Sequence, residues 1–111
     1  LAALAVASCF GGVVEANPSN PVVVSGTAVL QQSGNLLSIT NSPNAIINWG
    51  SFSIGANEIT RFIQQSQASA VLNRVVGQDP SVILGALQSN GRVLLINPNG
   101  ITIGAGASID V

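Results

Sequence analysis

The chain has 111 residues, enough for one small domain; 47% of them are hydrophobic and only 6% are charged, whereas an average soluble domain has about 25% charged residues. The net charge is −1, and the three cations, Arg61, Arg74 and Arg92, are far apart in the sequence. Nucleic acid and an anionic membrane surface are therefore excluded as partners, because both require clustered cations.

The N-terminal stretch, residues 1–14 (LAALAVASCFGGVV), is uncharged and rich in Ala, Leu and Val. It is shorter than the roughly 20 apolar residues of a membrane span and is typical of the apolar core of a secretory signal peptide whose basic start is missing. Val14 and Ala16 suit positions −3 and −1 of a cleavage site. We therefore expect cleavage after Ala16, which would remove residues 1–16 and leave residues 17–111 as the mature domain.

Two other interpretations of this stretch stay open. Residues 6–9 (VASC) resemble a lipobox, in which Cys9 would be lipidated, although the residues after Cys9 stay apolar and offer no polar tether. The stretch could also be a buried first strand or helix of a cytosolic domain, against which the Ala-rich run and the cleavage-like end argue. Since Cys9 is the single cysteine, the sequence has neither a disulfide framework nor a cysteine-based metal site.

After Asn17, short apolar runs alternate with turn residues, which is typical of an all-β domain. Leu37 and Ile39, and likewise Ile101 and Ile103, alternate with polar residues as in strands with one buried face. The expected strands are residues 22–24, 28–30, 36–40, 46–49, 52–54, 59–63, 71–76, 93–96, 101–103 and 109–111.

A weak internal repeat indicates stacked coils. Residues 52–59 (FSIGANEI) resemble residues 101–109 (ITIGAGASI): both have an apolar residue, a hydroxyl, Ile, Gly and Ala, then a bridge to Ile. Such self-similarity is expected when strands stack as the coils of a solenoid. The sequence therefore predicts a β-helix.

One segment departs from this β pattern. Asp79 is suited to cap a helix and Pro80 to occupy its first turn, while Gly91 is suited to the left-handed position after a helix. We therefore expect one short helix near residues 80–88, although Gly85 is unfavourable inside it.

The most specific feature is the run Asn97-Pro98-Asn99-Gly100-Ile101, a tight turn between two apolar strands. Pro98 fixes φ, Asn99 can bond back to the backbone, and Gly100 takes the positive φ that chain reversal requires. Taken alone, the run is a structural turn and nothing more.

Its context resembles a known family. Residues 73–111 (NRVVGQDPSVILGALQSNGRVLLINPNGITIGAGASIDV) and residues 45–58 (AIINWGSFSIGANE) are similar to the haemagglutination-activity, or two-partner-secretion, domain of filamentous-haemagglutinin-like exoproteins. The resemblance runs from about Asn20 to the last residue. The family's tetrapeptide Asn-Pro-Asn-Leu is absent, and residues 17–20 (NPSN) are no equivalent. The family's domain also has many more coils, so we interpret the chain as the front part of a longer protein.

The resemblance implies a right-handed parallel β-helix with N-terminal capping strands and a function without catalysis or cofactor. Proteins of this family cross the inner membrane by the Sec machinery. The periplasmic POTRA domains of a partner outer-membrane β-barrel (TpsB type) then recognise them, and they fold outside the Gram-negative cell. The resemblance marks Asn97–Ile101 as a secretion or folding motif, with Asn73 and Arg74 as secondary candidates. Arg74 is expected to be a solvated outward side chain rather than a specific contact, and Trp49 a core or cap residue rather than a ligand platform.

Two rival functions can be compared with the residues present. A polysaccharide-lyase-like or glycosidase-like enzyme needs paired carboxylates or a metal, yet the four acids, at positions 15, 58, 79 and 110, are scattered, and no His or Lys is available to activate a serine. We therefore expect neither an enzyme nor a metal site. An adhesive or structural surface module exported by another route would have the same coils, and downstream regions could contact host or neighbouring cells.

Overall fold

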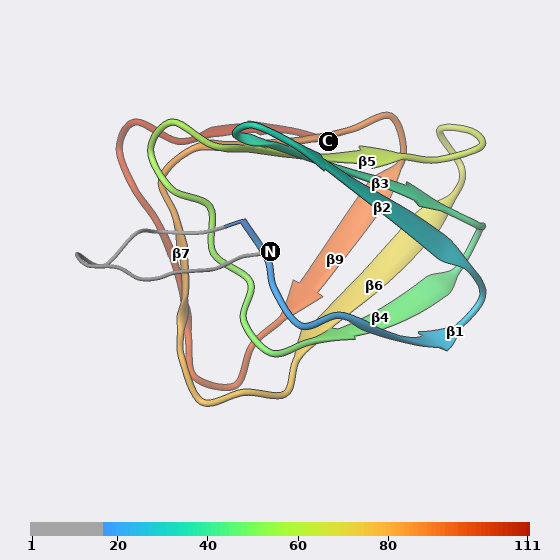
Figure 1. The fold of residues 1–111 in the computed structure, drawn as a ribbon, viewed down its shortest axis with the longest axis horizontal. Coiled ribbons are helices and arrows are strands. Elements are labelled where there is room, and N and C mark those ends of the chain that lie inside the picture. Colours follow the sequence, from blue (N-terminus) through green and yellow to red (C-terminus); the bar gives the residue numbers. More distant parts are fainter. Residues whose placement is uncertain (1–16) are drawn as a thin grey trace.

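The computed structural model describes residues 17–111, and all regular elements of this part of the chain are strands (Figure 1). The predicted cleavage site after Ala16 and Cys9 lie outside the described residues. The strands are β1 (Val22–Ser25), β2 (Ala28–Ser33), β3 (Leu36–Asn41), β4 (Ala45–Trp49), β5 (Ile59–Ile63), β6 (Ala70–Val75), β7 (Ser81–Ile83), β8 (Ala86–Ser89), β9 (Arg92–Ile96), β10 (Ile101–Ile103) and β11 (Ser108–Asp110). Within residues 17–111, no helix is long and apolar enough to cross a membrane.

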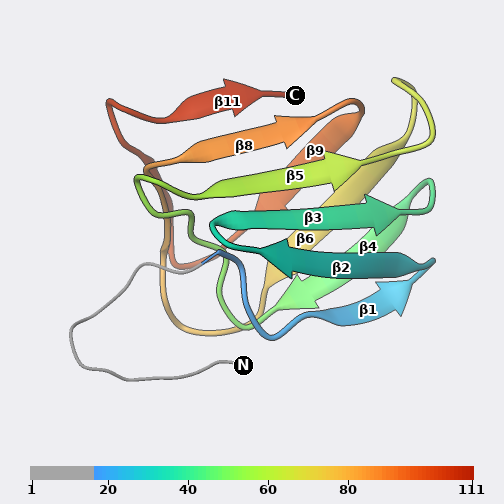
Figure 2. The same cartoon turned by 45° about the horizontal axis from the view of Figure 1, so that its top comes forward.

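The strands wind into coils with three faces, which enclose a triangular cross-section in Figure 1. One face is the sheet β1-β4-β6-β9, the second is the sheet β11-β8-β5-β3-β2, and the third is the pair β10-β7. Figure 2 shows the second sheet as a ladder in which each coil lies on the one before it. The described chain is a right-handed parallel β-helix of about three turns, as the resemblance implied.

The register between coils is parallel and continuous. Ala45 lies opposite Val71, which lies opposite Val93; on the second face, Ile39 lies opposite Phe62. Because directly opposed residues point to the same side of a sheet, each inward position forms a column through the coils. This register keeps the apolar residues of successive coils in contact.

The N-terminal end of the β-helix is closed by two strands that run antiparallel to their neighbours in the first coil. β2 pairs antiparallel with β3, and β1 pairs antiparallel with β4 with a register shift between Val23 and Ser25. Beneath them, the side chain of Asn17 donates to the carbonyl oxygen of Asn35 (3.1 Å) and accepts from the hydroxyl of the fully buried Thr60 (2.8 Å). β1 and β2 are therefore the expected N-terminal capping strands.

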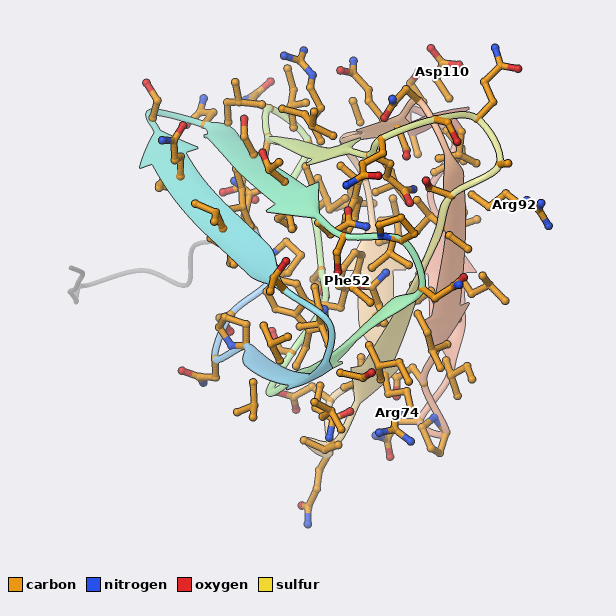
Figure 3. All side chains as sticks on the ribbon, turned by 90° about the vertical axis from the view of Figure 1, so that its right-hand side faces the viewer. Phe52, Arg74, Arg92 and Asp110 are labelled. Atoms are coloured by element: carbon orange, nitrogen blue, oxygen red, sulfur yellow. The ribbon has the colours of Figure 1, made fainter. Side chains whose placement is uncertain are left out.

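The core fills the space between the three faces. Trp49, Phe52 and Phe62 are its largest buried side chains. The Trp49 and Phe52 rings meet edge to face at 5.6 Å, and Phe52 stacks on Phe62 at 6.4 Å, within the separations that favour aromatic pairs. Figure 3 shows Phe52 inside the coils of the β-helix. Trp49 is therefore a core residue, as expected.

The predicted short helix near residues 80–88 is wrong. This segment contains β7 and β8, separated by a corner at Gly85, and within β7 Ser81 and Ile83 are buried while Val82 is half-buried. The helix-start signal was local, whereas the strand is held by its neighbours: Ile83 pairs with Ile54 on one side and with Ile103 on the other. Pairing of the backbone on both sides outweighs the capping preference of two residues.

The internal repeat corresponds to equivalent positions two coils apart, since Ile54 and Ile103 both flank Ile83 on the third face. The intervening copy, residues 81–86, is the segment for which the sequence predicted a helix. Leu37 and Ile39 have the predicted buried face. Ile101 and Ile103 are 44% and 59% exposed, because β10 has a strand partner on one side only.

Candidate functional site: the Asn97–Ile101 turn and its contacts between coils

The run Asn97–Ile101 is a tight turn at the corner between β9 and β10. The amide of Gly100 donates to the carbonyl oxygen of Asn97 (3.0 Å), which closes a four-residue turn with Pro98 at its second position. Gly100 has φ +109°, the conformation expected of it. Within the turn, Oδ1 of Asn97 accepts from the backbone amide of Asn99 (2.9 Å) and from its Nδ2 (3.2 Å). The backbone group that the Asn99 side chain bonds to lies in the preceding corner and not in the turn itself.

Asn97 also ties the turn to the coil before it. Its Nδ2 donates to the backbone carbonyl of Asp79 and to the hydroxyl of Ser81, both at 3.0 Å. Asn97 is 9% exposed and Ser81 is fully buried, so water has little access to these bonds. A buried polar group costs stability unless it is hydrogen-bonded, and here each partner satisfies the other.

Two further hydrogen bonds join the turn to the preceding corner; together with the two bonds of Asn97 we call them the clamp. The Nδ2 of the exposed Asn99 donates to the carbonyl oxygen of Gly77 (2.9 Å), and the amide of Ser81 donates to the carbonyl oxygen of Gly100 (2.9 Å). The turn therefore lies on the preceding corner, residues 77–81, which we call the lower corner. The candidate motif is a connector between two consecutive coils, with the ring of Pro98 and the side chain of Ile101 left exposed.

Asn73, the first secondary candidate, lies inside the core rather than at the surface. Its side chain is fully buried; its Oδ1 accepts from the indole Nε1 of Trp49 (2.8 Å) and its Nδ2 donates to the carbonyl oxygen of Leu94 (3.2 Å). One residue of β6 thus bonds to the coil on either side of it. Its place argues for a role in fold and register.

Arg74, the second candidate, is the next residue along β6 and points outward, away from Phe52 (Figure 3). It is half-buried, and its Nε donates to Oδ1 of Asn48 on β4 (3.0 Å). It is therefore not simply solvated. Arg74 lies opposite Ile96, the residue just before the Asn97 turn, so the structure brings both secondary candidates close to the motif in register, although their side chains hydrogen-bond elsewhere.

Several other residues that connect the coils were not indicated by the sequence. Gln64, 5% exposed, accepts from Nδ2 of Asn41 (3.3 Å) and donates to Arg92 O (2.8 Å) and Ser89 Oγ (3.0 Å), forming a second connector between coils at another corner. Ser81 fell within the predicted helix. Only the recurrence of Asn, Gln and Ser at the ends of apolar runs could have indicated these corners, and that pattern is common in turns.

The site offers hydrogen-bonding groups rather than reactive ones. Amide, hydroxyl and backbone groups make up the Asn97 turn and the lower corner, apart from the carboxylate of Asp79. Across residues 17–111, no group of three or more His, Cys, Asp and Glu is placed to hold a metal ion. The arrangement can hold two coils in register and present a short apolar and polar turn at the surface.

Comparisons with known proteins show which sequences and structures this chain is similar to. The family model of the TPS secretion domain matches residues 14–111. Two Heme/hemopexin-binding proteins of Haemophilus influenzae are similar: one is 42% identical over 95 residues, 85% of this chain and 10% of its own, and the other 36% over 109 residues, 94% of this chain and 12% of its own. The chain therefore spans about a tenth of the length of these relatives.

The crystal structure of the HMW1 secretion domain from Haemophilus influenzae has a similar fold. Its TM-score to this chain is 0.83, with 50% sequence identity over 84% of this chain and 25% of that chain.

Proposed function

The chain belongs to the family of TPS secretion domains, and from this premise we propose that it directs the export of a large exoprotein through recognition by its partner outer-membrane transporter. The observation that carries the proposal is the agreement of sequence and fold, over most of the chain, with the solved HMW1 secretion domain. The family is one of secretion domains of exoproteins and is not known as an enzyme family.

The export route that we propose crosses two membranes, and the chain is unfolded between them. The exoprotein enters the periplasm by the Sec machinery, and the POTRA domains of a TpsB-type barrel bind the unfolded segment. Strands such as β2 (AVLQQS) and β3 (LLSITN) are uncharged and combine apolar with neutral polar residues, which suits pairing with an exposed strand edge in the partner. The absence of cysteine from residues 17–111 avoids disulfides that would block passage.

Folding at the cell surface then makes export irreversible. Each coil buries its apolar side chains on the coil before it, as in the column of Ala45, Val71 and Val93, and such burial stabilises by roughly 25 cal/mol per Å² of apolar surface. We propose that the Asn97–Ile101 turn acts in this step, because its bonds to the lower corner hold a newly arrived coil on the previous one.

The names of the relatives do not extend this proposal to a ligand. Those proteins are called heme/hemopexin-binding, but the similar segment is only 10–12% of their length. A shared segment of that size supports a shared route of export and does not carry over the binding activity for which those proteins are named.

Export is the test. The natural full-length exoprotein is produced with and without its cognate barrel, and the protein in the medium is quantified. We expect release to depend on the barrel, and Asn97→Ala to reduce it severalfold, since this substitution removes two bonds from the clamp. Asn57→Ala, at an exposed corner, is the control. Release without the barrel would contradict the proposal and favour an adhesive or structural module exported by another route.

Leader processing is proposed separately. The released protein is expected to begin at Asn17, because the predicted cleavage site follows Ala16. Mass spectrometry of the mature N-terminus measures this directly. A lipid-modified Cys9 as the first residue would replace the signal peptide with a lipid anchor.

A further inference from the structure

The outer face of the sheet β1-β4-β6-β9 carries an unusual central row. Ile46, Leu72 and Leu94 lie opposite one another on β4, β6 and β9, and they alternate with the inward residues of the core. Leu94 is 50% exposed. These three strands therefore carry an aliphatic row on their outer side in addition to the apolar residues that they bury, a pattern typical of sheets that are covered on both faces.

Two cations border this central row. Arg74 lies in the next outward row, between Asn48 and Ile96, and Arg92 lies opposite Ala70 in the row on the other side. Alternate residues of a strand are about 6.6 Å apart, so each arginine row is one such step from the apolar row. Both side chains extend outward in Figure 3.

The strands of this face carry cations but no acid, although Asp110 of the neighbouring sheet lines a hollow together with Arg92. The four strands read VVVS, AIINW, AVLNRV and RVLLI, so they contribute two arginines and no carboxylate. Within residues 17–111, the two guanidinium groups donate to neutral oxygens, from Arg74 Nε to Asn48 Oδ1 and from Arg92 Nη2 to Ala68 O at 3.4 Å. A guanidinium group has five N–H donors, and its strongest partners are anions.

The neighbouring sheet shows what an ordinary outer face of this β-helix looks like. Its central outward row is polar and of mixed charge: Gln31, Ser38, Arg61, Gln88 and Asp110. Arg61 there is bonded to Gln88 (2.9 Å). The apolar row bordered by cations without acids is thus a property of one face and not of the fold.

We propose that this face, the outer side of β4, β6 and β9, is a docking surface for an acidic amphipathic segment of another protein. The segment has an aliphatic side chain on the row of Ile46, Leu72 and Leu94 and carboxylates two residues before and after it. In an extended chain that spacing matches the rows of Arg92 and Arg74. The proposal concerns the folded β-helix and goes beyond its export.

The test uses the full-length exoprotein in its released, folded form and a synthetic probe. The probe is a disulfide-closed β-hairpin peptide that displays Glu-Thr-Leu-Thr-Glu on one strand, and its control has Lys in place of both Glu. Binding is measured by fluorescence anisotropy at low salt. We expect the acidic probe to bind at least tenfold more tightly than the basic one, and Arg74→Glu or Leu72→Asn to weaken it about tenfold.

Arg61→Glu is the matched control, because it makes the same charge change on the other sheet, and it should leave the affinity unchanged. If Arg74→Glu fails to fold, as judged by circular dichroism, Arg92→Glu tests the same charge at an exposed position. Equal binding of both probes, or binding that survives both arginine substitutions, overturns the proposal. Two other results also overturn the proposal. One is that the protein binds phosphatidylglycerol vesicles and not the peptide, and the other is that it self-associates through this face, in a way that Leu72→Asn abolishes. Each of these results leaves barrel-dependent export as a separate question.

Discussion

Asn73 shows how one polar side chain can organise an apolar core. It is fully buried, and both of its polar atoms have partners, Trp49 in one coil and the Leu94 carbonyl in the next. A shift of β6 by one residue would turn Asn73 outward and leave the indole N–H of Trp49 without its acceptor. We infer that Asn73 selects the register of its coil, in addition to filling space.

A double-mutant cycle at this pair measures that role. Asn73→Leu leaves the buried indole N–H unsatisfied, so we expect it to lower the free energy of unfolding by about 1–3 kcal/mol. Trp49→Phe removes the donor but leaves a cavity, and the double variant should be less destabilised than the sum of the two. Urea denaturation of the full domain gives the change in the free energy of unfolding for the two single variants and the double variant. Simple additivity would mean that the hydrogen bond contributes nothing specific.

At the scale of the element, the corners determine where one strand can follow another. Gly85 joins β7 to β8, and a Cβ placed on it would lie 2.2 Å from the carbonyl oxygen of Gly55 and 2.3 Å from that of Glu58. The coils approach so closely here that only glycine fits. The Asn97 turn differs in character: besides one backbone bond, from Ser81 to Gly100, its hydrogen bonds to the lower corner are donated by the side-chain amides of Asn97 and Asn99.

Gly85→Ala is therefore expected to destabilise the domain by about 3 kcal/mol or more, because backbone atoms of the preceding coil would have to move. Gly106→Ala is the matched control, since a Cβ added there would meet nothing within 4 Å and the φ of Gly106 is not in the left-handed region; its midpoint of thermal unfolding should stay close to that of the wild type. A Gly85→Ala domain that unfolds at the wild-type temperature would contradict the close contact of these coils.

At the scale of the whole molecule, stability is shared unequally along the axis. β5 and β6 are each paired in parallel on both sides, whereas β1 and β2 are paired on one side only. The valines of β1 are 37–62% exposed, and the core lies between the coils from β3 onward. In such a stack each coil depends on its neighbours.

Hydrogen exchange of the folded, full-length protein should follow this order. Amides of β5 and β6 are expected to exchange slowest and those of β1 the fastest, because local opening of an edge strand breaks fewer contacts. Mass spectrometry of peptic fragments reads the two regions separately. Equal protection of β1 and β6 would indicate that another segment covers the capping strands.

Much of the architecture could be predicted from the sequence because its signals are local. Runs such as Leu37–Ile39 alternate with period two, the turn at Gly100 needs a positive φ that glycine adopts freely, and the family motif around Asn97 is contiguous. These determined most of the strands, the β-helix and the secretion-domain family. The expected strand at residues 52–54 is only an isolated bridge at Ile54, and β7 and β8 were not expected. Local signals also produced the largest error, the helix near residues 80–88, since Asp79 and Pro80 are equally suited to a corner.

What the tertiary structure alone decided are the contacts between residues far apart in the chain. No pattern predicts that Asn73 bonds to Trp49, that Asn97 bonds to the lower corner, or that Gly85 touches Gly55. The rows on the outer face of β4, β6 and β9 also depend on register. The physical reason is that a β-helix pairs residues about one coil apart, and the length of each coil is set by corners whose geometry emerges only when the coils stack.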